Sequence, residues 1–199
     1  MALAVWPPVA LSQSSAAQDA DVRNNSAAIA NRAAEALKAT LPNPLTEQER
    51  GFIAKAMAGG AYEAEASNIG ARRAVAPAVK SYAQMLVEQH GQANKELAQM
   101  VSERNAEVAP SLAPDKRETI AMLHKTTGFD ATFIRSVGIE AHQADIALFE
   151  QAYAQTEDAP LKAWIGNKLP IWRAHLAQAQ QIALRNAPDK AQSNSGTKR

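Results

Sequence analysis

The sequence predicts an all-α protein whose main body is an antiparallel four-helix bundle. Hydrophobic residues make up 46% of its 199 residues and aromatics only 5%, and alanine, the best helix former, is abundant. No run alternates β-branched and polar residues over the length of a strand. Four long segments place apolar residues at steps of three and four, with proline-containing breaks between them.

Residues 1–18 are predicted to be what remains of a signal peptide. Ala2 to Leu11 is apolar, and small or polar residues follow to Gln18, with cleavage sites at Ala10-Leu11-Ser12 or Ser15-Ala16-Ala17. This pattern predicts export to the periplasm or cell envelope; the alternative is an apolar tail. The stretch is too short to span a bilayer, and no other stretch comes close.

Residues 19–45 are predicted to form an extra N-terminal helix and a linker. Asp21 to Ala39 has an amphipathic pattern, and Leu41 to Pro44 interrupts it with two prolines. At the other end, residues 186–199 are small and polar, which predicts a disordered tail. The bundle domain is therefore expected to cover residues 46–185.

The first predicted hairpin begins at Thr46, which has capping-box spacing to Glu49. Its first helix extends to about Ala74. Pro77 suits the first turn of the second helix, which extends to about Asn105. The predicted core residues of this second helix are Val79, Ala83, Leu86, His90, Ala93, Leu97 and Met100.

The second hairpin follows a longer connection, in which a short helix is predicted from Asp115 to Lys125. Asp130 is a candidate N-cap for the third helix, which extends to about Gln155. The fourth helix restarts at Asp158-Ala159-Pro160. The predicted core residues are Ile139, His142, Ile146, Phe149 and Tyr153 on the third helix, and Leu161, Ile165, Trp172, His175, Ala179 and Ile182 on the fourth.

Three histidines and one acid are predicted to share a layer at the middle of the bundle. His90, His142 and His175 lie on the apolar faces of three helices, and Glu63 faces inward from the remaining one. Counted from the turns at a rise of 1.5 Å per residue, their heights differ by only about 3 Å. Such a set suits one transition-metal ion (Zn, Cu, Fe, Mn or Ni), with the carboxylate offsetting part of its charge.

Other interpretations of this layer stay open. Each histidine can instead be a core residue satisfied by one hydrogen bond, with Glu63 pairing with one of them. A di-iron site is disfavoured, because Glu88 and Glu140 precede the histidines by two residues rather than three. Asp145 is a further candidate, as an additional ligand or as a partner of one.

The order of several short motifs resembles a bacterial exported family known as domain of unknown function 4142. These motifs are Gly59-Gly60-Ala61-Tyr62-Glu63, Met85-Leu86-Val87-Glu88-Gln89-His90, Phe129-Asp130, His142 with Phe149-Glu150, and Leu169-Pro170 with His175-Leu176. The resemblance covers about residues 47–184. It implies a ferritin-like four-helix bundle in the periplasm or envelope, with recurrent positions at Glu63, His90, His142 and His175, and it implies no activity.

The sequence therefore favours an exported bundle that stores, buffers or senses a transition metal at Glu63, His90, His142 and His175. The alternative is a non-catalytic envelope or stress-related interaction protein with a metal-free core. The balance of 21 basic against 20 acidic residues argues against a nucleic-acid partner. An enzyme is disfavoured, because the chain has no cysteine, phosphate loop or nucleophile elbow.

Overall fold

The structure is a computed structural model that describes residues 28–32 and 44–186. The chain divides into two compact units, Met1–Pro42 and Asn43–Arg199. Within the first unit, residues 28–32 are helical. The expected signal segment 1–18, most of the expected helix from Asp21 to Ala39, and the tail from residue 187 lie outside the described residues.

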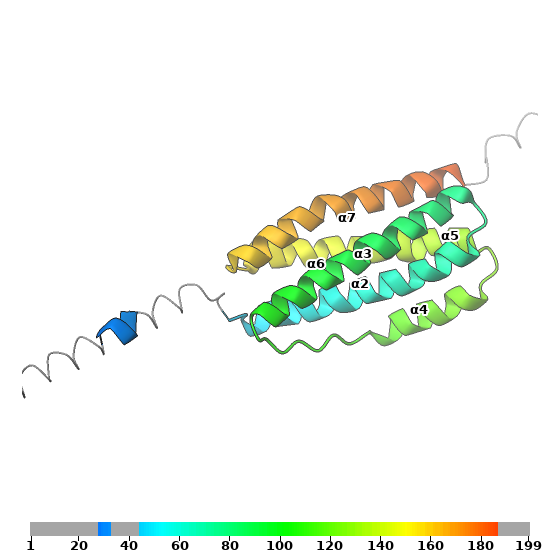
Figure 1. Ribbon diagram of the computed structural model, residues 1–199. Coiled ribbons are helices and arrows are strands. Elements are labelled where there is room, and N and C mark those ends of the chain that lie inside the picture. Colours follow the sequence, from blue (N-terminus) through cyan, green and yellow to red (C-terminus); the bar gives the residue numbers. More distant parts are fainter. Residues whose placement is uncertain (1–27, 33–43, 187–199) are drawn as a thin grey trace, which may run out of the picture. The chain divides into compact units, whose positions relative to one another are not determined.

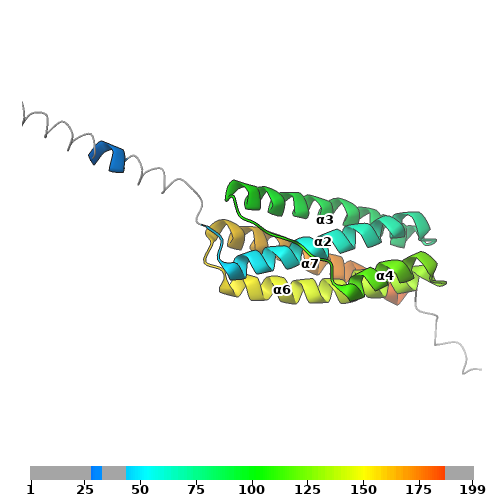
Figure 2. The same cartoon turned by 90° about the horizontal axis from the view of Figure 1, so that it is seen from below.

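The second unit is a bundle of four helical rods, as predicted (Figure 1). Helices α2 and α3 form one hairpin, and a rod composed of three consecutive helical segments forms another with α7. The predicted helix in the connection is α4, which lies against α2 (Figure 2). The bounds are α2 Glu47–Arg73, α3 Pro77–Glu103, α4 Pro114–Lys125, α5 Phe129–Phe133, η1 Ile134–Ala141, α6 His142–Gln155 and α7 Ala159–Arg185. Over residues 28–32 and 44–186 there is no strand.

The predicted cap of the first helix is confirmed, and a second cap lies where the fourth helix was predicted to restart. Thr46 and Glu49 form the capping box of α2: the Thr46 hydroxyl accepts from the Glu49 backbone N–H at 3.2 Å, and the Thr46 N–H donates to the Glu49 carboxylate at 2.9 Å. At α7, the Asp158 carboxylate accepts from the Leu161 N–H at 2.8 Å. Since each cap satisfies backbone donors that the helix leaves free, these two starts are fixed by local sequence.

The prediction for Asp130 is wrong: its side chain binds the α2–α3 turn and does not cap its own helix. The third rod starts at Phe129 after Gly128, whose φ of 61° supplies the change of chain direction. The Asp130 carboxylate instead accepts from the N–H groups of Val75 (3.0 Å) and Ala76 (2.7 Å). These groups precede α3, which has no capping side chain of its own. Asp130 thereby joins the α2–α3 turn to the third rod.

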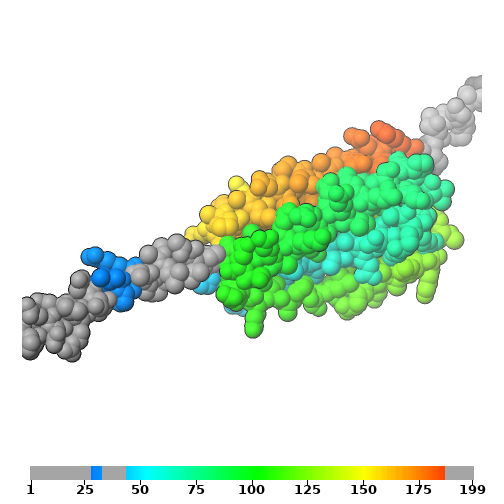
Figure 3. All heavy atoms as spheres, viewed as in Figure 1, coloured from blue at the N-terminus to red at the C-terminus, as the bar shows by residue number. Residues whose placement is uncertain are grey.

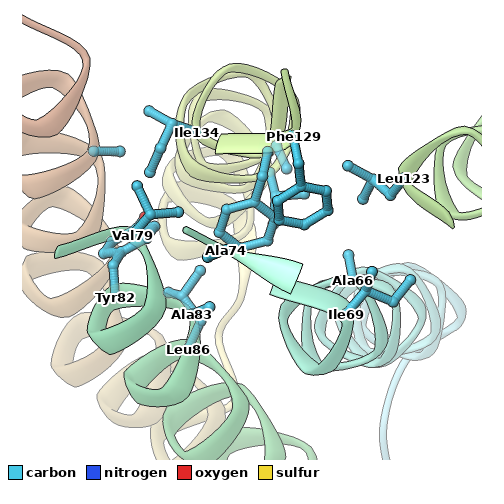
Figure 4. Close-up of a cluster of buried hydrophobic side chains, with 14 of the residues drawn as sticks. Ala66, Ile69, Ala74, Val79, Tyr82, Ala83, Leu86, Leu123, Phe129 and Ile134 are labelled. Atoms are coloured by element: carbon cyan, nitrogen blue, oxygen red, sulfur yellow. The ribbon is translucent and has the colours of Figure 1, made fainter. Parts of the chain in front are cut away.

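The apolar core consists of two clusters, one toward each end of the bundle. Figure 4 shows the first cluster, in which side chains of α2, α3, α4 and the third rod meet. The second contains Phe52, Leu97, Phe149, Leu161 and other buried residues near the start of α2 and α7. Both contain residues that the apolar stripes predicted.

Tyr153 is an exception to the predicted core of the third rod, because 43% of its surface is exposed. Its ring lies over Gly166 of α7, and the Lys162 ammonium stands 5.4 Å from its centroid. The ring therefore covers the surface of α7 rather than entering the core.

Among the described residues, none of the helices combines the length and apolarity needed to cross a lipid bilayer.

Candidate metal centre

Four buried polar side chains meet between the two apolar clusters, one from each rod. Glu63 comes from α2, His90 from α3, His142 from the start of α6 and His175 from α7. Each is at most 2% exposed. The structure therefore brings together all four residues that the sequence selected. His124, the remaining histidine, is exposed near the end of α4.

The three imidazoles are close enough to share one ion. One ring nitrogen from each lies within 4.8 Å of a ring nitrogen from each of the others. The separation between Nε2 of His142 and Nδ1 of His175 is 3.1 Å. The ring centroids are 5.2–5.6 Å apart.

Each imidazole also has one nitrogen next to an oxygen acceptor. The Nδ1 atom of His142 lies 2.9 Å from the Val137 carbonyl oxygen. The Nε2 atom of His175 lies 2.7 Å from Oε1 of Gln89. The Nδ1 atom of His90 lies 3.0 Å from a carboxylate oxygen of Glu63. An oxygen therefore stands beside one nitrogen of every ring.

The Val137 carbonyl reaches His142 because of the π-helical segment η1. In a π-helix, the carbonyl beneath a residue is that of the fifth residue before it. Val137 stands five residues before His142, and the His142 backbone N–H bonds to Ile139 instead. The sequence predicted one uninterrupted α-helix here. The π-helical segment that ends beside His142 was not predicted.

Burial keeps the three histidines neutral. It lowers the pKa of His90 to about 4 and that of His175 to about 3, and it also lowers the pKa of His142. A neutral imidazole carries one N–H and one lone pair. If Nδ1 of His142 and Nε2 of His175 carry the N–H groups and donate to their neighbouring oxygens, the lone pairs of these two rings lie on Nε2 of His142 and Nδ1 of His175. The Nε2 atom of His90 has no hydrogen-bond partner although it is buried.

Aromatic side chains hold these rings in place. The indole of Trp172 stacks on the His90 imidazole, with centroids 4.5 Å apart and planes 12° apart. The Tyr82 hydroxyl donates to the backbone carbonyl of His175 at 3.1 Å. Both aromatic residues are buried, so the His90 ring and the α7 backbone have little freedom to move.

The carboxyl groups of Glu63 and Asp145 are close enough to affect each other's ionisation. Burial raises the pKa of Glu63, although the nearby His142 opposes this. Burial and repulsion from Glu63 raise the pKa of Asp145 well above its ordinary value. Each acid opposes ionisation of the other, so the pair takes up a proton more readily than two isolated carboxyl groups do. Asp145 was predicted to be an additional ligand or the partner of one, and in the structure the group that it affects is Glu63.

Glu63 contacts two of the histidines. Its second oxygen lies 3.2 Å from Nδ1 of His142, yet neither oxygen makes a well-aligned hydrogen bond. Glu63 is not part of the group whose ligand atoms lie within 4.8 Å of one another, which is limited to the three histidines. That Glu63 binds an ion directly stays a prediction.

Gln89 and Val137 contact the histidines of the candidate centre, but the sequence did not predict a role for either residue. Gln89 directly precedes His90 in the chain and is only half-buried, so it falls outside the apolar stripe of α3. Val137 contributes a backbone carbonyl, and a sequence carries no signal for that role.

Comparisons with known proteins agree with this fold. The family model described as "Domain of unknown function (DUF4142)" matches residues 34–182. The crystal structure of a DUF305 fragment from Deinococcus radiodurans is similar, with a TM-score of 0.63 and 16% identity over 72% of this chain and 99% of that one. At this identity the likeness concerns the fold alone. None of the curated proteins matches the chain.

Proposed function

This chain belongs to the DUF4142 family, and we propose that its bundle binds one transition-metal ion through His90, His142 and His175. The observation that carries the proposal is the complementary environment of the three rings. Each ring has an oxygen beside one nitrogen, and one nitrogen of each ring lies within 4.8 Å of one from each of the others. Histidine ligands of metals almost always have such an outer oxygen partner, which fixes the ring and its tautomer.

The contact between His142 and His175 supports a cation in particular. When both outer nitrogens donate to their oxygens, two lone pairs face each other across 3.1 Å. Lone pairs at this distance repel, and a shared cation turns the repulsion into attraction. In a tetrahedral site with metal–nitrogen bonds of about 2.0–2.1 Å, ligand nitrogens lie about 3.3 Å apart. The observed separation is already close to that value.

Glu63 supports the same site electrostatically. Its carboxyl group lies beside the outer nitrogens of His90 and His142, where ionisation would offset part of the positive charge of an ion. Binding of a cation favours the ionised form of Glu63, so we expect proton release from the Glu63–Asp145 pair on loading.

The donor set suits Zn, Cu, Fe, Mn or Ni, and among divalent ions the ordinary order of affinities favours copper. Ligands that are at most 2% exposed favour slow exchange of the ion, which fits storage or buffering better than rapid sensing.

The apolar stretch from Ala2 to Leu11 supports export, so we place this role in the periplasm or envelope. Cell fractionation with an antibody against the bundle tests the location; recovery in the cytoplasm alone would contradict it.

Metal-dependent melting tests the binding. The untagged protein is stripped with a chelator, mixed with each of the five ions and heated while its circular dichroism is followed. An ion at 100 times its Kd stabilises the folded state by about 2.7 kcal/mol. We expect His175→Gln to abolish this stabilisation.

The matched control is His124→Gln, which makes the same chemical change at the exposed histidine and should leave the stabilisation intact. X-ray absorption spectra of the loaded protein count the imidazole and oxygen ligands, and so test the prediction for Glu63. Melting curves that none of the five ions shifts would refute the proposed site.

A further inference from the structure

A groove follows the seam between α3 and α7, directly outside the candidate centre. Its volume is about 560 Å³, and its walls come from these two helices alone. They include Gln89 on α3 and Trp172, Ala174 and His175 on α7. Figure 3 shows the two helices side by side on one face of the bundle, α3 in green and α7 in orange.

His175 forms the boundary between this groove and the centre. Its Nδ1 atom faces Nε2 of His142 inside the bundle. Its Nε2 atom contacts Gln89, which also lines the groove. One imidazole thus contacts the interior through Nδ1 and the groove wall through Nε2.

The larger groove of the bundle offers no comparable approach. Its volume is about 780 Å³, and it lies where the start of α2 meets the end of α6, near Thr46 and Thr156. None of the three histidines lines it. The α3–α7 groove therefore combines solvent access with a candidate ligand.

The contact that closes the α3–α7 groove is weak enough to open. Gln89 and His175 are both neutral, and one neutral hydrogen bond contributes about 0.5–1.5 kcal/mol net. Gln89 is only half-buried, so its amide can turn toward the solvent. The exposed carboxylate of Glu88 and the thioether of Met85 also line the groove and can attract a metal cation.

We propose that transition-metal ions reach and leave the centre through the α3–α7 groove, passing the edge of His175 when Gln89 releases it. The inference rests on the proposed function, because it requires an ion to bind at the three histidines. It assigns Gln89 two roles: it orients His175 while the ion is bound, and it closes the route.

Stopped-flow kinetics of copper(II) or nickel(II) uptake test the route. Bound paramagnetic ions should quench the fluorescence of Trp172, which stacks on His90 at 4.5 Å. Ala174→Phe narrows the groove, since Ala174 is an exposed residue that lines it. The matched control is Ala177→Phe, an equal change at an exposed residue of the same helix that does not line the groove.

We expect Ala174→Phe to slow association and dissociation by the same factor, fivefold or more, with Kd unchanged, and Ala177→Phe to behave as the wild type. Equal rate constants in the two variants and the wild type would overturn the route while leaving the proposed function intact. A weaker Kd caused by faster dissociation alone would also overturn it, because position 174 would then support the bound state. Absence of binding in the wild type with every ion would overturn both proposals.

Discussion

Gly138 offers a way to disturb the candidate centre without altering any residue in it. It lies in η1, where the third rod packs against α7 and α3. A Cβ atom at this position would stand 2.8 Å from Cβ of Ala179 and 3.2 Å from the Tyr82 ring. Carbon atoms pack best at about 3.5–4.0 Å, so Gly138→Ala requires α7 to retreat by roughly 1 Å.

The expected cost follows from two opposing effects. Overpacking of this kind destabilises a core by about 1–3 kcal/mol, while alanine stabilises a helix over glycine by about 0.5–1 kcal/mol. Gly91→Ala isolates the second effect, because a Cβ at Gly91 meets nothing within 4 Å. We therefore expect Gly138→Ala to be less stable than Gly91→Ala by about 1–3 kcal/mol.

The effect should extend to metal binding. Ala179 lies one helical turn after His175, and Tyr82 bonds to the His175 carbonyl, so displacing α7 shifts one of the three converging rings. Urea unfolding of the metal-free variants gives the stability difference, and metal-dependent melting gives the effect on the ion. If Gly138→Ala is as stable as Gly91→Ala and gains as much from the ion, then the close packing of η1 against α7 does not set the geometry of the centre.

Three further expectations follow. Gln89→Ala should weaken metal affinity by about 10–100-fold, as loss of an outer partner of a histidine ligand does. Gln92→Ala is the control: Gln92 lines the same groove, but its side chain bonds Glu96, so its loss should leave the affinity unchanged. Calorimetric Kd values that are equal for the two variants would contradict the role of Gln89. Asp130→Ala should lower the free energy of unfolding by about 0.5–1.5 kcal/mol per lost hydrogen bond, because the N–H groups of Val75 and Ala76 lose their acceptor, whereas Asp115→Ala on the exposed start of α4 should cost less. In the folded, metal-free protein the buried His90 has a pKa of about 4, whereas a histidine in the unfolded chain has a pKa of about 6.5. Between these two pH values the unfolded state binds one more proton, so the free energy of unfolding falls as the pH falls. In urea titrations, His90→Gln should reduce this slope by up to about 1.4 kcal/mol per pH unit. The same dependence of stability on pH in His90→Gln and in the wild type would show that burial does not hold the His90 imidazole neutral.

The helices and the shared layer were predictable because both depend on local rules. Apolar spacing and capping residues such as Thr46 and Asp158 define the rods. Counting residues from each turn then gives the height of a side chain, because every rod rises by 1.5 Å per residue. This count was enough to bring Glu63 and the three histidines together.

The remaining features depend on contacts between rods. The π-helical turn has no local signature, and it occurs where Gly138 lets α7 approach. Asp130 has a sequence position that suits its own helix, but the α2–α3 turn brings two unpaired N–H groups within its reach. The partnership of Gln89 with His175 depends on the rotation of α7 relative to α3. None of these distances can be counted along one helix.

The position of the polar layer has a consequence for how the bundle comes apart. An apolar cluster lies on each side of the layer, but within the layer the rods meet through histidine and carboxyl groups. We therefore expect the two halves to be joined less firmly than each is held within itself. Without an ion we expect hydrogen exchange to detect two blocks of amides that open separately. An ion bound by three of the rods would merge them into one block, and the protein would then register metal through the cooperativity of its unfolding rather than through a change of shape.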